Sequence, residues 1–146
     1  MTNWVWGTLV SRVAVFNALT TNEALNTLGI DLDSVFHNYT LEERPIKAGP
    51  FVILRWGEMD RPPFKGVKSF VRLTLWVHWP LEETNDFSKI DNLLDICDEV
   101  LENMNGESGI DGYTITCVRS TGRSGDLKDD GFQTISKNAS YEVLFR

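Results

Sequence analysis

The sequence has few residues of the kinds that build metal centres, disulfide frameworks and catalytic dyads. Its 146 residues include two cysteines and two histidines. Cys97 and Cys117 lack the spacing of a zinc ribbon and lie within apolar patterns, so we expect reduced, inert thiols that meet in the core. His37 and His78 have no neighbouring nucleophile or carboxylate in a recognisable catalytic arrangement. These scarcities predict a protein that is not an enzyme and that needs no metal or cofactor.

Long apolar runs are also missing. The most apolar stretch, residues 71–79, is interrupted by Arg72 and His78 and is about half of the roughly 20 residues that a membrane helix needs. We therefore expect no insertion into a membrane. The first twelve residues lack the basic segment, apolar core and cleavage site of a secretory signal, so we expect the chain to stay in the compartment where it is made.

Positive charge is scarce relative to negative charge. Twenty-one acidic residues against fourteen basic residues give a net charge of −7. Proteins bind nucleic acid largely by neutralising phosphates with Lys and Arg, so this balance disfavours a protein that grips DNA. An acidic surface still suits a place where DNA must pass without adhering.

What the sequence does contain is the hydrophobic periodicity of one α+β domain spanning residues 1–146. Apolar residues at helical spacing predict helices over residues 8–19 and 87–104, with Gly29 closing a short helical turn between them. Runs rich in β-branched and aromatic residues predict strands at residues 34–39, 50–56, 69–79, 113–120 and 138–146. We expect an antiparallel or mixed sheet of about four to five strands, with two main helices packed on one face.

The longer predicted helix has two contrasting faces. One is an apolar stripe that includes Leu94, where a charge is expected to unfold the protein. The opposite face is acidic and carries Asp91, Asp95, Asp98, Glu99 and Glu102. Such faces usually contact only water, which is the first interpretation. The second interpretation is the wall of a channel or a docking surface.

Two polar connections are long enough to carry contacts with a partner. Prolines interrupt residues 58–68, and because proline lacks the amide donor of a central strand we expect an exposed loop there. Residues 121–131 are polar and punctuated by glycine, and we expect them to project from the domain. Each is either an ordinary surface connection or a contact site. The candidate contact residues are Asp60, Arg61, Pro62, Pro63, Phe64, Lys65, Arg123, Asp126, Lys128, Asp129 and Asp130.

Five segments suggest a known family through their order and composition. They are the early helix ending near Leu19 and the runs PFVILRW, SFVRLTLWVHW, DNLLDICDEVL and DLKDDGFQTISKNASYEVLFR. Over nearly the whole chain this arrangement resembles the tail terminator, or tail completion, proteins of siphophages. The resemblance is one of pattern and involves no catalytic motif.

The resemblance implies a hexameric ring that sits on the last ring of the tail tube, stops polymerisation and presents a docking surface to the head connector. The partners would be further copies of the chain, the major tail tube protein and the head-tail connector protein, with DNA only passing through the lumen. The protein would be assembled in the bacterial host cytoplasm and reside in the virion, at the head-proximal end of the tail. On this hypothesis, the two polar connections contact subunits or the tail tube, and the acidic helix face is a lumen or docking face.

The sequence is also compatible with other identities. The first alternative is another head-tail joining, head-completion or minor tail protein. The more distant alternative is a small metabolic enzyme or regulatory domain, since an α+β fold alone does not specify a function.

Overall fold

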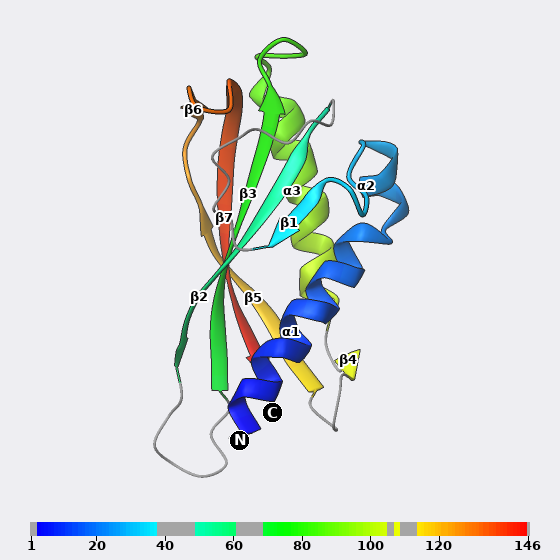
Figure 1. Cartoon of the computed structure of the whole chain (residues 1–146), viewed down its shortest axis with the longest axis vertical. Coiled ribbons are helices and arrows are strands. Elements are labelled where there is room, and N and C mark those ends of the chain that lie inside the picture. Colours follow the sequence, from blue (N-terminus) through cyan, green and yellow to red (C-terminus); the bar gives the residue numbers. More distant parts are fainter. Residues whose placement is uncertain (1–2, 38–48, 61–68, 105–106, 109–113, 146) are drawn as a thin grey trace.

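The computed structural model describes residues 3–37, 49–60, 69–104, 107–108 and 114–145. Its helices are α1 (Asn3–Thr20), α2 (Glu23–Thr27) and α3 (Phe87–Glu102). Its strands are β1 (Val35–His37), β2 (Phe51–Asp60), β3 (Ser69–Pro80), β4 (Glu107–Ser108), β5 (Thr114–Arg123), β6 (Leu127–Asp129) and β7 (Thr134–Phe145). The two long helices, α1 and α3, pack on one face of a twisted mixed sheet (Figure 1). The predicted α+β class is confirmed.

Within the described residues the sheet has seven strands. Six of them follow the order β1-β2-β3-β7-β5-β4, and β6 pairs with residues 134–136 of β7, on the side of β7 that β5 also occupies. β1 runs parallel to β2, and the other pairs are antiparallel. β3 and β7 pair along their whole length, from Ser69 opposite Phe145 to Pro80 opposite Thr134. The predicted strand count was too low because β4 and β6 have two and three residues, which is too short for alternation to be recognised.

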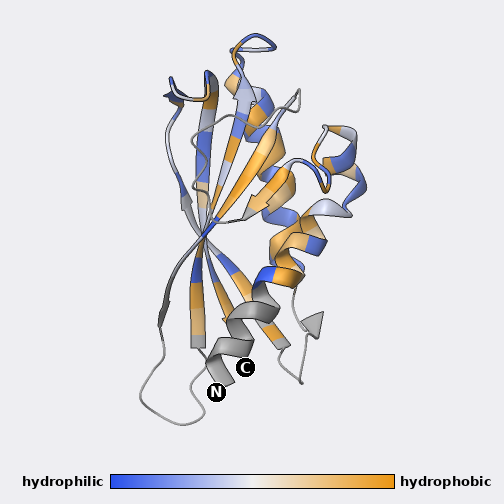
Figure 2. Cartoon of the chain, in the orientation of Figure 1, coloured by the Kyte–Doolittle hydropathy of each residue, from blue (hydrophilic) through white to orange (hydrophobic). Residues whose placement is uncertain are grey.

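The register turns one apolar set of side chains toward the helices. From β3 this set includes Val71, Leu73, Leu75 and Val77, all buried. The matching stripe of α3 consists of Ile90, Leu93, Leu94, Cys97 and Leu101, which are also buried. Figure 2 shows hydrophobic residues along the strands and the long helices. Each large side chain fully buried in this layer contributes about 1.5 to 3 kcal/mol before ordering entropy is subtracted, so the stripe holds α3 on the sheet.

Capping residues mark both ends of α2 and the start of α3. The Asn22 side chain accepts a hydrogen bond from the Leu25 N–H at 3.0 Å and begins α2. Gly29 follows α2 with φ of +100°, the left-handed conformation predicted for it. The Asp86 carboxylate accepts the Ser88 N–H at 2.9 Å and begins α3.

The prediction that residues 121–131 project from the domain is wrong, because most of these residues belong to the sheet. β5 continues to Arg123, and β6 resumes pairing with β7 at Leu127, opposite Ser136. Between them, the Ser124 N–H donates to the Asn138 carbonyl at 2.9 Å, and the Ser124 hydroxyl accepts the Asn138 N–H at 3.0 Å. These two hydrogen bonds hold the corner between β5 and β6, residues 124–126, against β7. The polar sequence therefore forms a sheet edge.

The two cysteines do not meet, contrary to the sequence prediction. Cys97 is fully buried between α3 and the sheet. Cys117 is paired with Leu144, and Leu144 with Phe70, in the set of residues that faces away from the helices. A sheet therefore separates the thiols. Burial raises the pKa of the Cys97 thiol to about 12, which makes it unreactive at neutral pH.

Other boundaries differ from the predicted ones by a few residues. α1 begins at Asn3 instead of residue 8, and β7 begins at Thr134 instead of residue 138.

No helix in the part of the chain that the structure describes is both long and apolar enough to cross a membrane.

Candidate functional site

Three of the five predicted carboxylates on α3 bind side chains of β5 and β7. Arg123, the last residue of β5, places its Nη2 2.7 Å from an Asp95 oxygen and 2.5 Å from an Asp98 oxygen. The Tyr141 hydroxyl of β7 donates a hydrogen bond to the second oxygen of Asp98. A single carboxylate of α3 thus binds two strands of the sheet.

A second set of ion pairs lies one helical turn earlier. Lys137 of β7 places its Nζ 2.6 Å from Asp91 and 3.2 Å from Asp126, and its side chain is 12% exposed. We call Asp91, Asp95, Asp98, Arg123, Asp126, Lys137 and Tyr141 the ion-pair cluster. The cluster joins α3 to the corner between β5 and β6.

The protonation states of the cluster follow from these contacts. The hydrogen bond to Asp91 raises the pKa of Lys137, with burial acting in the opposite direction. Burial lowers the pKa of Arg123, but its hydrogen bonds to Asp98 and Asp95 outweigh this effect and raise it. Burial and the bond to Asp98 both raise the pKa of Tyr141. Both bases are charged and the phenol is neutral at physiological pH, so the ion pairs are intact.

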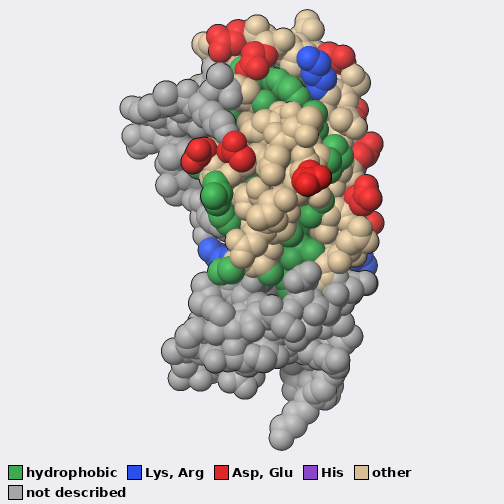
Figure 3. All heavy atoms as spheres, turned by 90° about the vertical axis from the view of Figure 1, so that its right-hand side faces the viewer, with side chains coloured by type: hydrophobic (Ala, Val, Ile, Leu, Met, Phe, Trp, Pro, Cys, Tyr) green, Lys and Arg blue, Asp and Glu red, His purple; other side chains and the backbone are tan. Residues whose placement is uncertain are grey.

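The cluster changes what the predicted contact residues can offer a partner. Asp91, Asp95 and Asp98 have intramolecular basic partners, whereas Glu99 and Glu102 are exposed on α3. Figure 3 shows the helical side, where acidic side chains gather at one end and along one margin. Sequence reasoning missed Lys137 and Tyr141. Lys137 could have been recognised from its position, because it falls on the same face of its strand as the apolar residues Ala139, Tyr141 and Val143.

Asp98→Ala is expected to destabilise the fold by about 2 kcal/mol, because it removes the acceptor of the Tyr141 hydroxyl and one partner of Arg123. Asp95→Ala is the matched control. Asp95 pairs with the same guanidinium, but its side chain is 70% exposed, so the expected loss is below about 1 kcal/mol. Urea unfolding of both variants measures the difference. Equal losses would contradict the central role of Asp98.

The opposite, outer face of the sheet carries an aromatic cluster around His78. Its ring stacks on Phe51 with centroids 4.9 Å apart and contacts Phe132 edge-on at 5.2 Å. Its Nδ1 lies 2.8 Å from the Thr134 hydroxyl oxygen. Burial lowers the pKa of His78 to about 4, opposed by the charge of Asp129. The imidazole is therefore neutral at pH 7 and acts as part of the packing.

A groove of about 150 Å³ opens beside this cluster. We call it the aromatic groove, and its lining residues are Ile53, Arg55, Trp76, His78, Asp129 and Phe132. Asp129 accepts the Phe132 N–H at 2.9 Å, which fixes the turn after β6. The groove has apolar walls and, in the exposed Arg55, a positively charged side chain. Sequence reasoning identified the mixed polarity of this face but did not identify the groove.

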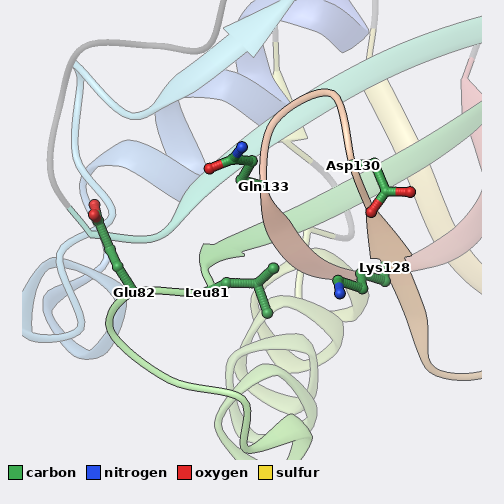
Figure 4. Close-up of a pocket in the computed structure, with 5 residues that line it drawn as sticks. All are labelled: Leu81, Glu82, Lys128, Asp130 and Gln133. Carbon is green, nitrogen blue, oxygen red and sulfur yellow. The ribbon is translucent and has the colours of Figure 1, made fainter.

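A second hollow, of about 270 Å³, lies where the turn after β3 meets the turn before β7 (Figure 4). Leu81, Glu82, Lys128, Asp130 and Gln133 line it. The Leu81 N–H donates to the Gln133 carbonyl at 3.0 Å and ties the two turns together. Two predicted contact residues, Lys128 and Asp130, therefore share one charged rim.

The other predicted contact loop connects β2 to β3. Asp60 is the last residue of β2, and β3 begins at Ser69. Arg61, Pro62, Pro63, Phe64 and Lys65 lie outside the described residues. Their role as contacts stays a prediction.

Comparisons with known proteins indicate the fold. No model of a protein family matches this chain, and no curated protein matches it. Among solved structures, it is similar to a chain in the structure titled "Virion of native gene transfer agent (GTA) particle". The TM-score is 0.68 with 13% sequence identity, and the match covers 94% of this chain and 96% of that chain. The two chains share their fold over nearly their whole lengths.

Proposed function

We propose that the chain is a noncatalytic structural protein of a phage-like particle. It closes into a hexameric ring on the last ring of the tail tube, ends tube polymerisation and forms the docking surface for the head connector. The observation that carries this proposal is the match, over 94% of the chain, to a chain from a gene transfer agent virion. The match supports a place in a virion, and the siphophage resemblance supports the terminator role.

The arrangement of the sheet supports assembly through heterologous contacts. A closed ring needs one patch on each copy to bind a different patch on the next copy. Among the described residues, β1 pairs only with residues 52–54 of β2, and β4 pairs only with residues 114–115 of β5. The short strands β1 and β4 therefore leave long stretches of β2 and β5 without a described partner strand on that side. The two edges differ in sequence and suit a contact between unlike patches.

The charge of the chain supports a ring through which DNA passes. The net charge of −7, which includes the exposed Glu99 and Glu102 of α3, repels phosphates. In this proposal the acidic helix face is turned to the lumen or to the connector. The tail tube, the connector and further copies of the chain are the partners.

The proposal is tested by assembly in the presence of tail tubes. Size-exclusion chromatography with light scattering is expected to show a hexamer, either of the free protein or after its addition to purified tubes. Loss of the gene is expected to give overlong tails in electron micrographs, because nothing then stops the tube. A monomer under both conditions contradicts the ring. Normal tails beside heads that leak DNA would instead indicate a head-completion protein.

A further inference from the structure

A leucine is strongly exposed in the turn between α2 and β1. Leu32 is 67% exposed, compared with 44% for Val13 and 39% for Leu127. Single exposed apolar residues are common and by themselves indicate nothing. Two further features indicate that Leu32 is a contact residue: the rigid turn that carries it, and the aromatic groove on the other side of the molecule.

The turn that carries Leu32 is held rigid by its own side chains. The Asp31 carboxylate accepts the Asp33 N–H at 2.9 Å, and the Ser34 hydroxyl accepts the Asp31 N–H at 2.7 Å. The Ser34 hydroxyl also donates to the Gly29 carbonyl at 3.0 Å and is fully buried. A preorganised turn loses little entropy when it binds. Leu32 and the exposed Asp33 are thus presented in a fixed conformation.

The aromatic groove has the size and polarity to receive such a turn. Its volume of about 150 Å³ is that of an engineered apolar cavity known to hold benzene. Ile53, Trp76 and Phe132 supply apolar walls, and Arg55 supplies an exposed positive charge. The Asp129 carboxylate in the lining already accepts the Phe132 N–H. A leucine followed by an aspartate matches the apolar walls and the guanidinium together.

The two features lie on different sides of one copy. The turn follows α2 on the side of the sheet that the helices cover (Figure 1). The residues that line the groove belong to the opposite face of the sheet. The two patches are unlike and differently directed, so their contact between copies repeats head to tail. Such a contact generates a ring when the rotation closes.

We propose that the Leu32–Asp33 turn of one copy inserts into the aromatic groove of the next copy. Leu32 packs against Ile53, Trp76 and Phe132, and the Asp33 carboxylate pairs with the Arg55 guanidinium. The inference rests on the proposed ring and assigns one of its subunit contacts. Its occupant is a second copy of this chain, because the turn presents an exposed apolar side chain for the walls next to a carboxylate whose charge is opposite to that of Arg55, while the Asp129 carboxylate of the lining is engaged by the Phe132 N–H.

Leu32→Arg tests the apolar part of the contact. We expect self-association to weaken by about tenfold or more, because a leucine that becomes buried contributes on this scale. The fold is expected to be unchanged, since the side chain is exposed in the single copy. Val13→Arg, at another exposed aliphatic residue, is the matched control and is expected to assemble normally. Light scattering over a concentration series, with and without tail tubes, measures assembly.

A charge exchange tests the polar part. Asp33→Arg and Arg55→Asp are each expected to weaken assembly by about threefold to tenfold, and the double variant is expected to recover most of the loss. A double variant as weak as the sum of the single changes would overturn the pairing. Normal assembly of Leu32→Arg would overturn the insertion, while the ring itself would stand.

A photo-crosslinking amino acid at position 32 locates the contact directly. In assembled wild-type-like rings, the crosslinked peptides are expected to join position 32 to residues 51–55, 76–78 or 129–132 of another copy. Crosslinks to other segments would overturn the proposal. If the unmodified chain forms no ring even on tail tubes, the proposed function fails, and this inference fails with it.

Discussion

Leu94→Asp is expected to leave the chain unfolded at 25 °C. Leu94 is fully buried within the apolar stripe that holds α3 on the sheet. The change removes about 1.5 to 3 kcal/mol of apolar burial and places a carboxylate where burial costs several kcal/mol more. The sum approaches the roughly 5 to 15 kcal/mol by which a domain of this kind is stable. Far-UV circular dichroism and urea unfolding measure the loss.

The control for this variant lies on the other face of the same helix. Glu102→Lys changes an exposed side chain near the end of α3, and its effect on the free energy of unfolding is expected to stay within about 0.5 kcal/mol. A folded Leu94→Asp protein with a normal unfolding midpoint would show that α3 is not anchored through its apolar stripe.

Folding stability is expected to fall by about 3 kcal/mol between pH 6.5 and pH 4 because of His78. Burial lowers the pKa of this imidazole from 6.5 to about 4 in the folded state. Between these values the unfolded chain binds a proton that the folded chain does not, so the stability present above pH 6.5 is lost as the pH falls. The size follows from about 1.4 kcal/mol per pKa unit.

His78→Phe separates this effect from the titration of carboxylates. A phenyl ring retains the stacking on Phe51 but has no titrating nitrogen and cannot bond to Thr134. The variant is expected to lose some stability at pH 7 and to show a shallower decline of stability from pH 6.5 to pH 5. Unfolding free energies measured across this range in both proteins give the difference. Identical slopes would show that His78 is not responsible.

The surfaces that the structure offers for assembly differ from those predicted from the sequence. The sequence placed them in two loops and on an acidic helix face. Five of those residues are engaged in ion pairs within the chain: Arg123 and Asp126 of the loops, and Asp91, Asp95 and Asp98 of the helix. The rigid turn at Leu32 and the aromatic groove were not identified from the sequence. An exposed leucine gives no signal of its own in a sequence, because its meaning depends on its surroundings.

Hydrophobic periodicity correctly predicted elements such as α3 and β3, which have one buried face and one solvent-exposed or mixed face. The apolar stripe of α3 and the alternation of β3 follow from the need to bury one side of each element, and both are visible within a dozen residues. The cap at Asp86 and the left-handed Gly29 are equally local. Short strands such as β6 escaped detection because three residues do not establish a period.

Hydrophobic periodicity is a local property, so the α+β class, the long helix and the central strands could be predicted from the sequence. Which side chains pair across distant segments depended on the tertiary structure. Arg123 meets Asp98 across 25 residues, and His78 meets Thr134 across 56. Such pairs depend on strand register and helix position, where a shift of one residue would turn a side chain to the other face. The ion-pair cluster, the neutral histidine and the groove therefore arise from packing between distant segments.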